Sequence, residues 1–297
     1  MSGQPWGIEQ IARTSRPRAR MRFAPCALLL ATAAGCSTVV SNIGTTQDAI
    51  YAASPTNIAS LTDVVQHNPN DPQAYNMRGS VLGEGGRAQE ALADFNKAIS
   101  LDPNFAQAYA NRALIYRQTG KLDLAAADYN KALSIEANYA PAYLGRGVVY
   151  RQRGQFILAL QDFNKAIQIR PDNAQAYFNR GLLYQSQRQH QFAIDDFSTA
   201  IGLSQQQAEP FVARGLSYMA INDFKAAAGD LDDAVQLEPQ NAKAWVSRGL
   251  AYERLGQKEK AAGSYAKALN IKQDNEQANQ GFTRVGGRYG QTYQAFD

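Results

Sequence analysis

The chain has 297 residues, with 30 lysines and arginines against 26 aspartates and glutamates. Residues 1–35 hold five arginines and one glutamate of these totals, so the remainder carries 25 side chains of each sign. A neutral remainder lacks the basic surface of a nucleic-acid-binding protein. The cysteines, Cys26 and Cys36, and the histidines, His67 and His190, are too few for a disulfide framework or a Cys/His metal site. We therefore predict no cofactor and no catalytic centre.

Residues 1–35 are predicted to be an export leader. Residues 13–22 hold five arginines and no acid, and residues 23–34 form an apolar stretch. That stretch is shorter than the roughly 20 apolar residues of a membrane-spanning helix. A basic region, a short apolar core and small residues at its end describe a secretory signal. Met21 would open a compact leader by itself, so residues 1–20 are a candidate for a start codon assigned too early.

The segment 33–36, Ala-Ala-Gly-Cys, resembles the bacterial lipobox. The resemblance implies that Cys36 is lipidated and becomes the first residue of the mature protein. Ser37 stands where aspartate would favour the inner membrane, so the resemblance implies an outer-membrane anchor facing the periplasm. The alternatives are an ordinary cleaved signal peptide and a short buried helix before a cysteine. Residues 36–57 show no strong period and are predicted to be a tether.

The rest of the chain repeats every 34 residues. The anchors of this pattern are aromatic residues: Tyr75, Tyr109, Tyr143, Tyr177, Phe211 and Trp245. In residues 104–137, small and aromatic side chains follow an i, i+4, i+7 spacing from Tyr109 and again from Ala125, which predicts two helices. Gly120 between them predicts a left-handed turn. One such hairpin cannot bury its own apolar face, so neighbouring hairpins must stack.

The repeated pattern Tyr/Phe/Trp-x2-Arg-Gly/Ala-x2-Tyr, then Ala-x3-aromatic, then Pro, resembles the tetratricopeptide repeat (TPR) signature. The resemblance implies an all-α fold, a right-handed superhelical α-solenoid of six helix hairpins with capping helices. The units are 72–105, 106–139, 140–173, 174–207, 208–241 and 242–275. We expect an N-terminal capping helix in residues 58–71. A C-terminal cap and tail occupy 276–297, with the tail either free or folded into the array's own groove.

Two units lack glycine at the turn between their helices. Arg188 and Asn222 replace it in the fourth and fifth units. Asparagine tolerates a left-handed backbone, whereas Arg188 is predicted to cost about 1 kcal/mol there. Pro103, Pro171 and Pro239 are predicted to end the second helix of their units.

Charged residues recur in phase with the anchors. The arginines on the first helices are Arg78, Arg112, Arg146, Arg180, Arg214 and Arg248, and the aspartates on the second helices are Asp94, Asp128, Asp162, Asp196 and Asp230. Binding of an acidic partner is one interpretation. We favour a structural ladder of arginine–aspartate pairs, because a half-buried charge needs a partner. Five aspartates for six arginines leave one end of this ladder unpaired. Tyr116 and its in-phase counterparts, residues 150, 184, 218 and 252, are predicted to pack in the core.

The resemblance also implies a concave groove lined by the first helices, through residues one, five and eight places after each anchor. From the second unit onward these are Ala110, Leu114, Arg117, Leu144, Val148, Arg151, Phe178, Leu182, Gln185, Val212, Leu216, Met219, Val246 and Leu250. Beyond them, Glu253 makes the far rim acidic. Packing against neighbouring helices is one interpretation, and binding of an amphipathic or extended peptide is the other. The family's lysine–asparagine clamp for a C-terminal carboxylate is not expected, because Ala110 and Leu114 stand in its place.

These features predict a non-enzymatic adaptor, a periplasmic TPR lipoprotein that binds other proteins through its groove. By resemblance the partners are cell-wall hydrolases and their proteases, or components of envelope assembly. One alternative is a pilotin-like assembly factor for a pilus or secretin. Others are a cytoplasmic scaffold, if the leader is not used, and a catalytic role, for which the sequence offers no residues.

Overall fold

The structure is a computed structural model that describes residues 53–288 and residue 293. All of these belong to one compact unit, Val39–Asp297. The predictions for the leader, Cys36 and most of the tether lie outside the described residues. The described part contains 14 helices and no strand. None of its helices is long and apolar enough to cross a membrane.

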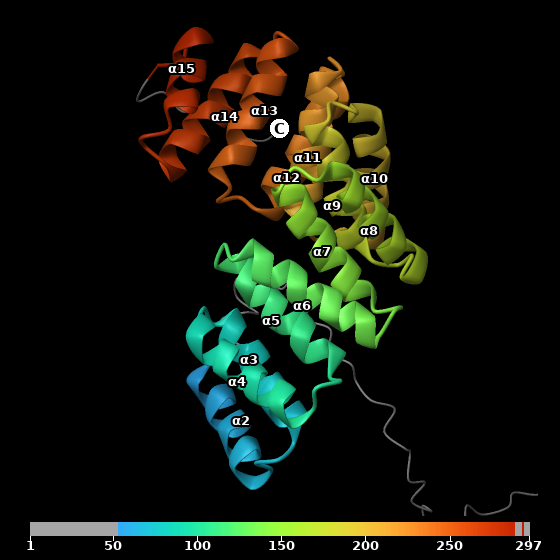
Figure 1. The fold of residues 1–297 in the computed structure, drawn as a ribbon. Coiled ribbons are helices and arrows are strands. Elements are labelled where there is room, and N and C mark those ends of the chain that lie inside the picture. Colours follow the sequence, from blue (N-terminus) through green and yellow to red (C-terminus); the bar gives the residue numbers. More distant parts are fainter. Residues whose placement is uncertain (1–52, 289–292, 294–297) are drawn as a thin grey trace, which may run out of the picture. The chain divides into compact units, whose positions relative to one another are not determined.

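Twelve of the helices form six consecutive hairpins, and one helix lies at each end of the array (Figure 1). The hairpins are α3 (Pro72–Glu84) with α4 (Ala88–Leu101), α5 (Ala106–Gln118) with α6 (Leu122–Ile135), α7 (Ala140–Gln152) with α8 (Phe156–Ile169), α9 (Ala174–Ser186) with α10 (His190–Leu203), α11 (Ala208–Ala220) with α12 (Phe224–Leu237), and α13 (Ala242–Arg254) with α14 (Lys258–Ile271). Each second helix packs on the first helix of the next hairpin, and first helices of successive hairpins also touch. The all-α array of six hairpins is confirmed.

The end helices differ slightly from the prediction. Helix α2 (Pro55–His67) starts at Pro55, inside the predicted tether, because Ser54 caps it by accepting a hydrogen bond from the Asn57 backbone at 3.3 Å. Helix α15 (Glu276–Arg284) lies within the predicted C-terminal segment 276–297 and packs on α13 and α14. Together they cover the two ends of the array.

Small residues allow the two helices of each hairpin to approach. Ala125 and Ala159 are fully buried, as are their counterparts in the other units. Gly147 lies opposite Phe163, and a Cβ at this glycine would come within 2.7 Å of the phenylalanine ring. An aromatic ring fills the space that the glycine leaves in the first, third, fourth and sixth hairpins, and Leu231 does so in the fifth.

The turns follow the sequence prediction, but the helix ends do not depend on proline. Gly120 has a φ of +75°, and Arg188 and Asn222 have φ values of 59° and 63°. Helices α6, α10 and α14 are each 14 residues long, as are α4, α8 and α12, although only the latter three have a proline two residues after their end. The prediction that Pro103, Pro171 and Pro239 end their helices is therefore too strong. All six helices end in the same way, because the residue after each has a non-helical backbone with φ between −150° and −127° and ψ between 79° and 98°.

Candidate peptide-binding groove

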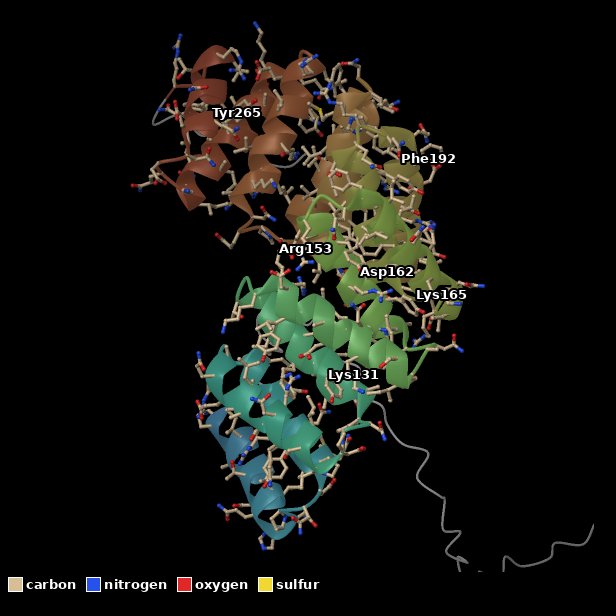
Figure 2. The ribbon with its side chains drawn as sticks, in the orientation of Figure 1. Lys131, Arg153, Asp162, Lys165, Phe192 and Tyr265 are labelled. Atoms are coloured by element: carbon tan, nitrogen blue, oxygen red, sulfur yellow. The ribbon has the colours of Figure 1, made fainter. Side chains whose placement is uncertain are left out.

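Five arginine–aspartate pairs link the two helices of the first five hairpins. In the second hairpin, Arg112 Nε donates to Asp128 Oδ2 at 2.7 Å and Nη2 donates to Oδ1 at 2.8 Å. The same bidentate geometry joins Arg78–Asp94, Arg146–Asp162, Arg180–Asp196 and Arg214–Asp230. All five aspartates are buried, and Asp162 is labelled in Figure 2. The pairs that the spacing predicts are therefore present, and the bidentate bonds already supply each of these arginines with a carboxylate.

The last arginine of the series is paired as well, so the prediction of an unpaired ladder end is wrong. Arg248 Nε donates to Asp232 Oδ1 at 2.6 Å, and Nη1 donates to Ser264 Oγ at 2.8 Å. Ser264 takes the place that aspartate has in the other units. The missing carboxylate is supplied instead by the preceding unit, through Asp232.

A second ladder, which the sequence analysis missed, joins neighbouring hairpins. Arg112 Nη1 donates to Asn96 Oδ1 in the preceding hairpin at 2.7 Å. The later arginines of the series bond in the same way to Asn130, Asn164, Ser198 and Asp232. These acceptors also recur every 34 residues, so the sequence does contain the signal. Each arginine from Arg112 onward therefore bonds to its own hairpin and to the one before it.

The in-phase tyrosines lie against the ladder arginines rather than deep in the core. Arg146 sits 5.5 Å from the Tyr143 ring centre and 5.7 Å from that of Tyr150. Tyr150 is half-buried, as are residues 116, 184 and 218, whereas Tyr252 is buried. Tyr252 also donates to Asp232 Oδ2 at 2.7 Å. All five rings belong to the buried clusters or pack against them, as predicted, and those of residues 116, 150, 184 and 252 contact a cation as well.

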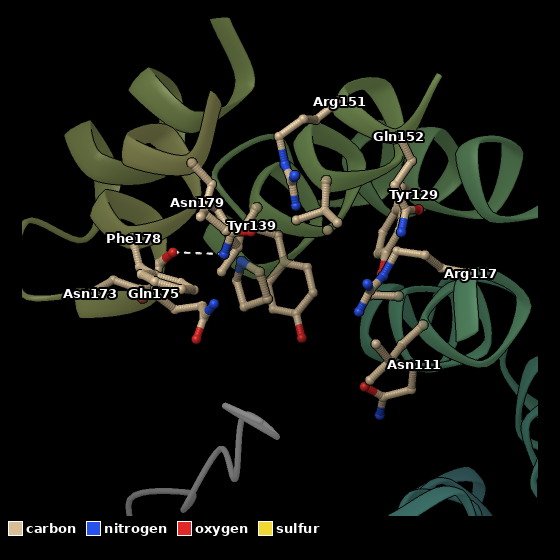
Figure 3. A pocket seen from close by; sticks show the side chains of 17 residues that line it. Asn111, Arg117, Tyr129, Tyr139, Arg151, Gln152, Asn173, Gln175, Phe178 and Asn179 are labelled. Atoms are coloured by element: carbon tan, nitrogen blue, oxygen red, sulfur yellow. Dashed lines mark hydrogen bonds between the residues drawn. The ribbon is translucent and has the colours of Figure 1, made fainter. Parts of the chain in front are cut away.

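A pocket of about 370 Å³ opens among the first helices of the second, third and fourth hairpins. Eight of the predicted groove residues line it: Ala110, Leu114, Arg117, Leu144, Val148, Arg151, Phe178 and Leu182. Figure 3 shows this pocket with its polar side chains labelled. The structure therefore brings the three consecutive sets of groove positions into one space.

Three residues of the pocket lie outside the first helices, and the groove positions predicted from the sequence do not include them. Tyr139 and Asn173 immediately precede helices α7 and α9, and Tyr129 reaches the pocket from α6. Burial raises the pKa of Tyr129 to about 12, so its hydroxyl stays protonated at neutral pH. In Figure 3 this hydroxyl lies beside the guanidinium of Arg117. The groove rule counts only first-helix positions, so it could not find these residues.

The other six predicted groove residues do not line this pocket. Gln185 donates to Ala213 O at 2.9 Å and to Ser217 Oγ at 2.8 Å. Val212 is buried, and Leu216, Met219 and Val246 pack against the apolar cluster that contains Trp245. Leu250 is partly exposed. Contacts with neighbouring elements thus explain five of these six positions but not the exposed Leu250, whereas the other eight predicted residues surround an open space.

The predicted acidic rim is also occupied by the protein itself. Glu253 Oε2 accepts hydrogen bonds from Arg284 Nη2 on α15 and from the Tyr265 hydroxyl, each at 2.8 Å. Arg284 in particular lowers the pKa of Glu253. The carboxylate therefore holds the C-terminal cap in place. Within the described residues, no group of three or more His, Cys, Asp or Glu side chains is placed to hold a metal.

Comparisons with known proteins match the fold. Family models described as "TPR repeat" and "Tetratricopeptide repeat" match residues 147–187, residues 58–104, 76–143 and 212–278, and residues 174–207. No curated protein matches the chain. A chain in the crystal structure of the APC/C hetero-tetramer Cut9-Hcn1 is similar, with 19% identity and a TM-score of 0.69 over 81% of this chain. This match spans only 48% of that longer chain.

Two smaller solved proteins match over most of their own length. YrrB, described as a TPR protein with an unusual peptide-binding site, has 26% identity and a TM-score of 0.53, covering 63% of this chain and 96% of its own. PilF of Pseudomonas aeruginosa has 19% identity and a TM-score of 0.65, covering 72% of this chain and 97% of its own. The repeated hairpins, their in-phase residues and these matches together place the chain in the tetratricopeptide repeat family.

Proposed function

We propose that this protein is a non-enzymatic adaptor that holds an extended or helical segment of a partner protein in the pocket of its second to fourth hairpins. The single observation that carries the proposal is the open pocket itself. Its walls include Leu114, Leu144, Phe178 and Leu182, apolar side chains that packing inside the array leaves partly accessible. An accessible apolar hollow with a few polar groups is the usual form of a binding site. The peptide-binding site in the description of YrrB supports the same use of the fold.

A crosslinking experiment tests the pocket. A photoreactive amino acid replaces Leu144, which lines the pocket, or Leu124, which is exposed on α6 and does not line it. We expect a discrete crosslinked partner peptide from position 144 in bacterial envelopes and none from position 124. Equal crosslinking from both positions, or none from position 144, would contradict the proposal.

We further propose that the protein is anchored through Cys36 and works in the periplasm, on partners from the cell envelope. The basic, apolar and small-residue pattern of residues 13–36 supports this. One acyl chain binds a membrane only weakly, whereas two or more bind it stably. Cys36 would therefore suffice as an anchor if it carries at least two acyl chains. Labelling with radioactive palmitate, followed by membrane fractionation, tests it. Label on the wild type that is lost in Cys36→Ala supports the anchor, and equal membrane association of both would refute it.

A further inference from the structure

Two arginines in the pocket lack the partners that the other in-phase arginines have. The Nε atoms of Arg117 and Arg151 are buried and have no hydrogen-bond partner among the described residues. Neither guanidinium forms an ion pair with a carboxylate in the described part of the chain. In contrast, Arg146, five residues before Arg151 on the same helix, is bound bidentately by Asp162. Both residues are partly exposed, but a charge whose Nε atom is buried without a partner still carries a desolvation cost that needs an explanation.

Packing inside the array does not provide that explanation. Gln185 occupies the equivalent position in the fourth hairpin, and it bonds to Ser217 of the next hairpin at 2.8 Å. The residues that correspond to Ser217 for Arg117 and Arg151 are Val149 and Leu183, both fully buried and without a polar side chain. The array can satisfy a polar group at this position through Ser217, but for the two arginines the corresponding residue of the next hairpin is apolar.

The two charges also disfavour each other. Burial, and then the nearby charge of Arg117, lower the pKa of Arg151. Arg117 has the Tyr129 hydroxyl beside it, which is neutral and brings no negative charge. The free pocket thus holds two like charges among apolar and amide side chains, without a carboxylate. An anion between them would relieve both effects, and a planar guanidinium matches a carboxylate bidentately.

We propose that the pocket recognises the side-chain carboxylate of a glutamate or aspartate, carried by an apolar segment of the partner protein. This proposal rests on the proposed function and adds which chemical group of the partner protein the pocket binds. The apolar part of the segment would lie on Leu144, Val148, Phe178 and Leu182, while the acid reaches Arg117 and Arg151. A side chain is favoured over a chain terminus because the pocket spans three hairpins, so a bound segment continues on both sides of the acid.

Stability of the free, full-length chain gives the first test. Methionine replaces the stem of arginine as far as Nε and removes the charged group, so Arg151→Met should raise Tm by about 2 to 4 °C, by removing an unpaired, partly buried charge. Arg146→Met, which breaks a ladder pair on the same helix, should lower Tm. Arg153→Met, two residues further along and paired with Asp123 outside the pocket, is the matched control and should lower Tm only slightly. A fall in Tm for Arg151→Met as large as that for Arg146→Met would show a structural role and overturn the proposal.

Binding gives the second test. The full chain is used to select from a display library of random 12-residue peptides whose C-termini are either free or amidated. The affinity of the best amidated peptide is then compared with that of its Glu→Gln or Asp→Asn form. We expect the peptide with Gln or Asn to bind the wild type and Arg153→Met about 10-fold or more weakly than the peptide with Glu or Asp. On Arg117→Met/Arg151→Met, the two peptides should bind equally.

The outcomes separate this proposal from the broader one. Peptides that bind the pocket, as judged by their loss in Leu144→Glu, but show no preference for an acid would overturn the carboxylate assignment and leave the adaptor function intact. Selection of free C-termini alone would overturn the choice of a side chain. Binding that arises only after deletion of residues 289–297 would make the chain's own tail the occupant, against the proposal. If no selected peptide depends on Leu144, both the adaptor site and its carboxylate are refuted.

Discussion

At the scale of single residues, Arg248 is paired with a carboxylate like the other arginines of the series, but the carboxylate comes from a different hairpin. The other five arginines of the series take their carboxylate from the second helix of their own hairpin, whereas Arg248 finds Ser264 there and takes Asp232 from the hairpin before. Arg248 is 3% exposed, and the ring centre of Tyr252 lies 4.8 Å from it. A guanidinium this deeply buried requires a carboxylate, but either side can supply it.

Replacing Asp232 should therefore be costly, and the cost should be reversible. Asp232→Asn removes the carboxylate from a buried guanidinium, with an expected loss of about 3 kcal/mol, at the low end for buried pairs because Asp232 is partly exposed. Ser264→Asp in the same chain recreates the pairing of the other five hairpins and should recover most of the loss. Urea denaturation of the single and double variants measures both effects. If Ser264→Asp gave no recovery, the pairing would not be interchangeable.

Arg188 is a second residue at which the backbone dictates the outcome. Its φ of 59° places a long side chain in the left-handed region, where the other turns mostly use glycine. Arg188→Gly should stabilise the protein by about 1 kcal/mol, which thermal unfolding measures. Asn222→Gly, at the φ of 63° in the next turn, serves as the comparison and should gain less, because asparagine tolerates this conformation. Equal gains at both sites would argue against strain at Arg188.

At the scale of elements, helix α15 depends on a few polar contacts with α13 and α14 in addition to its apolar face. Phe282 is buried against the cluster that contains Trp245 and Tyr265. Arg284 and Tyr265 both donate to Glu253, whose pKa is lowered chiefly by Arg284. Because this carboxylate serves the cap, the far end of the predicted groove is closed by the protein's own helix.

The contribution of Glu253 should depend on pH. A carboxyl group with a lowered pKa in the folded state stabilises the fold above its unfolded pKa, and this stability is lost as the pH falls through the folded pKa. The ordinary pKa of the group is 4.5, so the stabilisation by Glu253 should be complete at neutral pH. It should shrink as the pH falls below about 4.5 and vanish below the lowered pKa of the folded state. The measurement is the difference in unfolding free energy between wild type and Glu253→Gln as a function of pH. A difference that did not shrink on acidification would contradict the role of this group.

At the scale of the whole described array, the buried apolar residues form separate clusters along the chain instead of one core. The largest spans the fifth and sixth hairpins and α15, and it includes Trp245 and Tyr265. In a repeat array each unit contacts mainly its neighbours, so stability is approximately a sum of unit and interface terms. A defect at one end should therefore remain local.

Phe282→Ala tests this locality. The side chain is 2% exposed, and its truncation should cost about 3 kcal/mol or more at the C-terminal end. Hydrogen exchange should show faster exchange in α13, α14 and α15, with little change in α5 to α8 around the pocket. Loss of protection throughout the array would mean that the described residues unfold as one unit.

Sequence periodicity predicted the hairpins because each unit repeats the same local requirements. Helical spacing, a small residue opposite a ring and a left-handed turn are all set by residues close in sequence, and Gly120, Ala125 and Gly147 meet them as expected. The arginine–aspartate pairs were predictable for the same reason, because both partners recur within one hairpin. The role of Asp232 was not predicted, although its position also recurs every 34 residues, because its bond to Arg248 joins two different hairpins.

The sequence by itself therefore determined the family, the number of hairpins and the ladder that joins their helices. Only the tertiary structure decided which groove positions remain open. Gln185 finds an acceptor in the next hairpin and Glu253 is held by the cap, whereas Arg117 and Arg151 face a pocket without a carboxylate. The physical reason is that contacts with neighbouring hairpins decide whether a side chain is exposed or paired. Equivalent positions of different repeats have different neighbours.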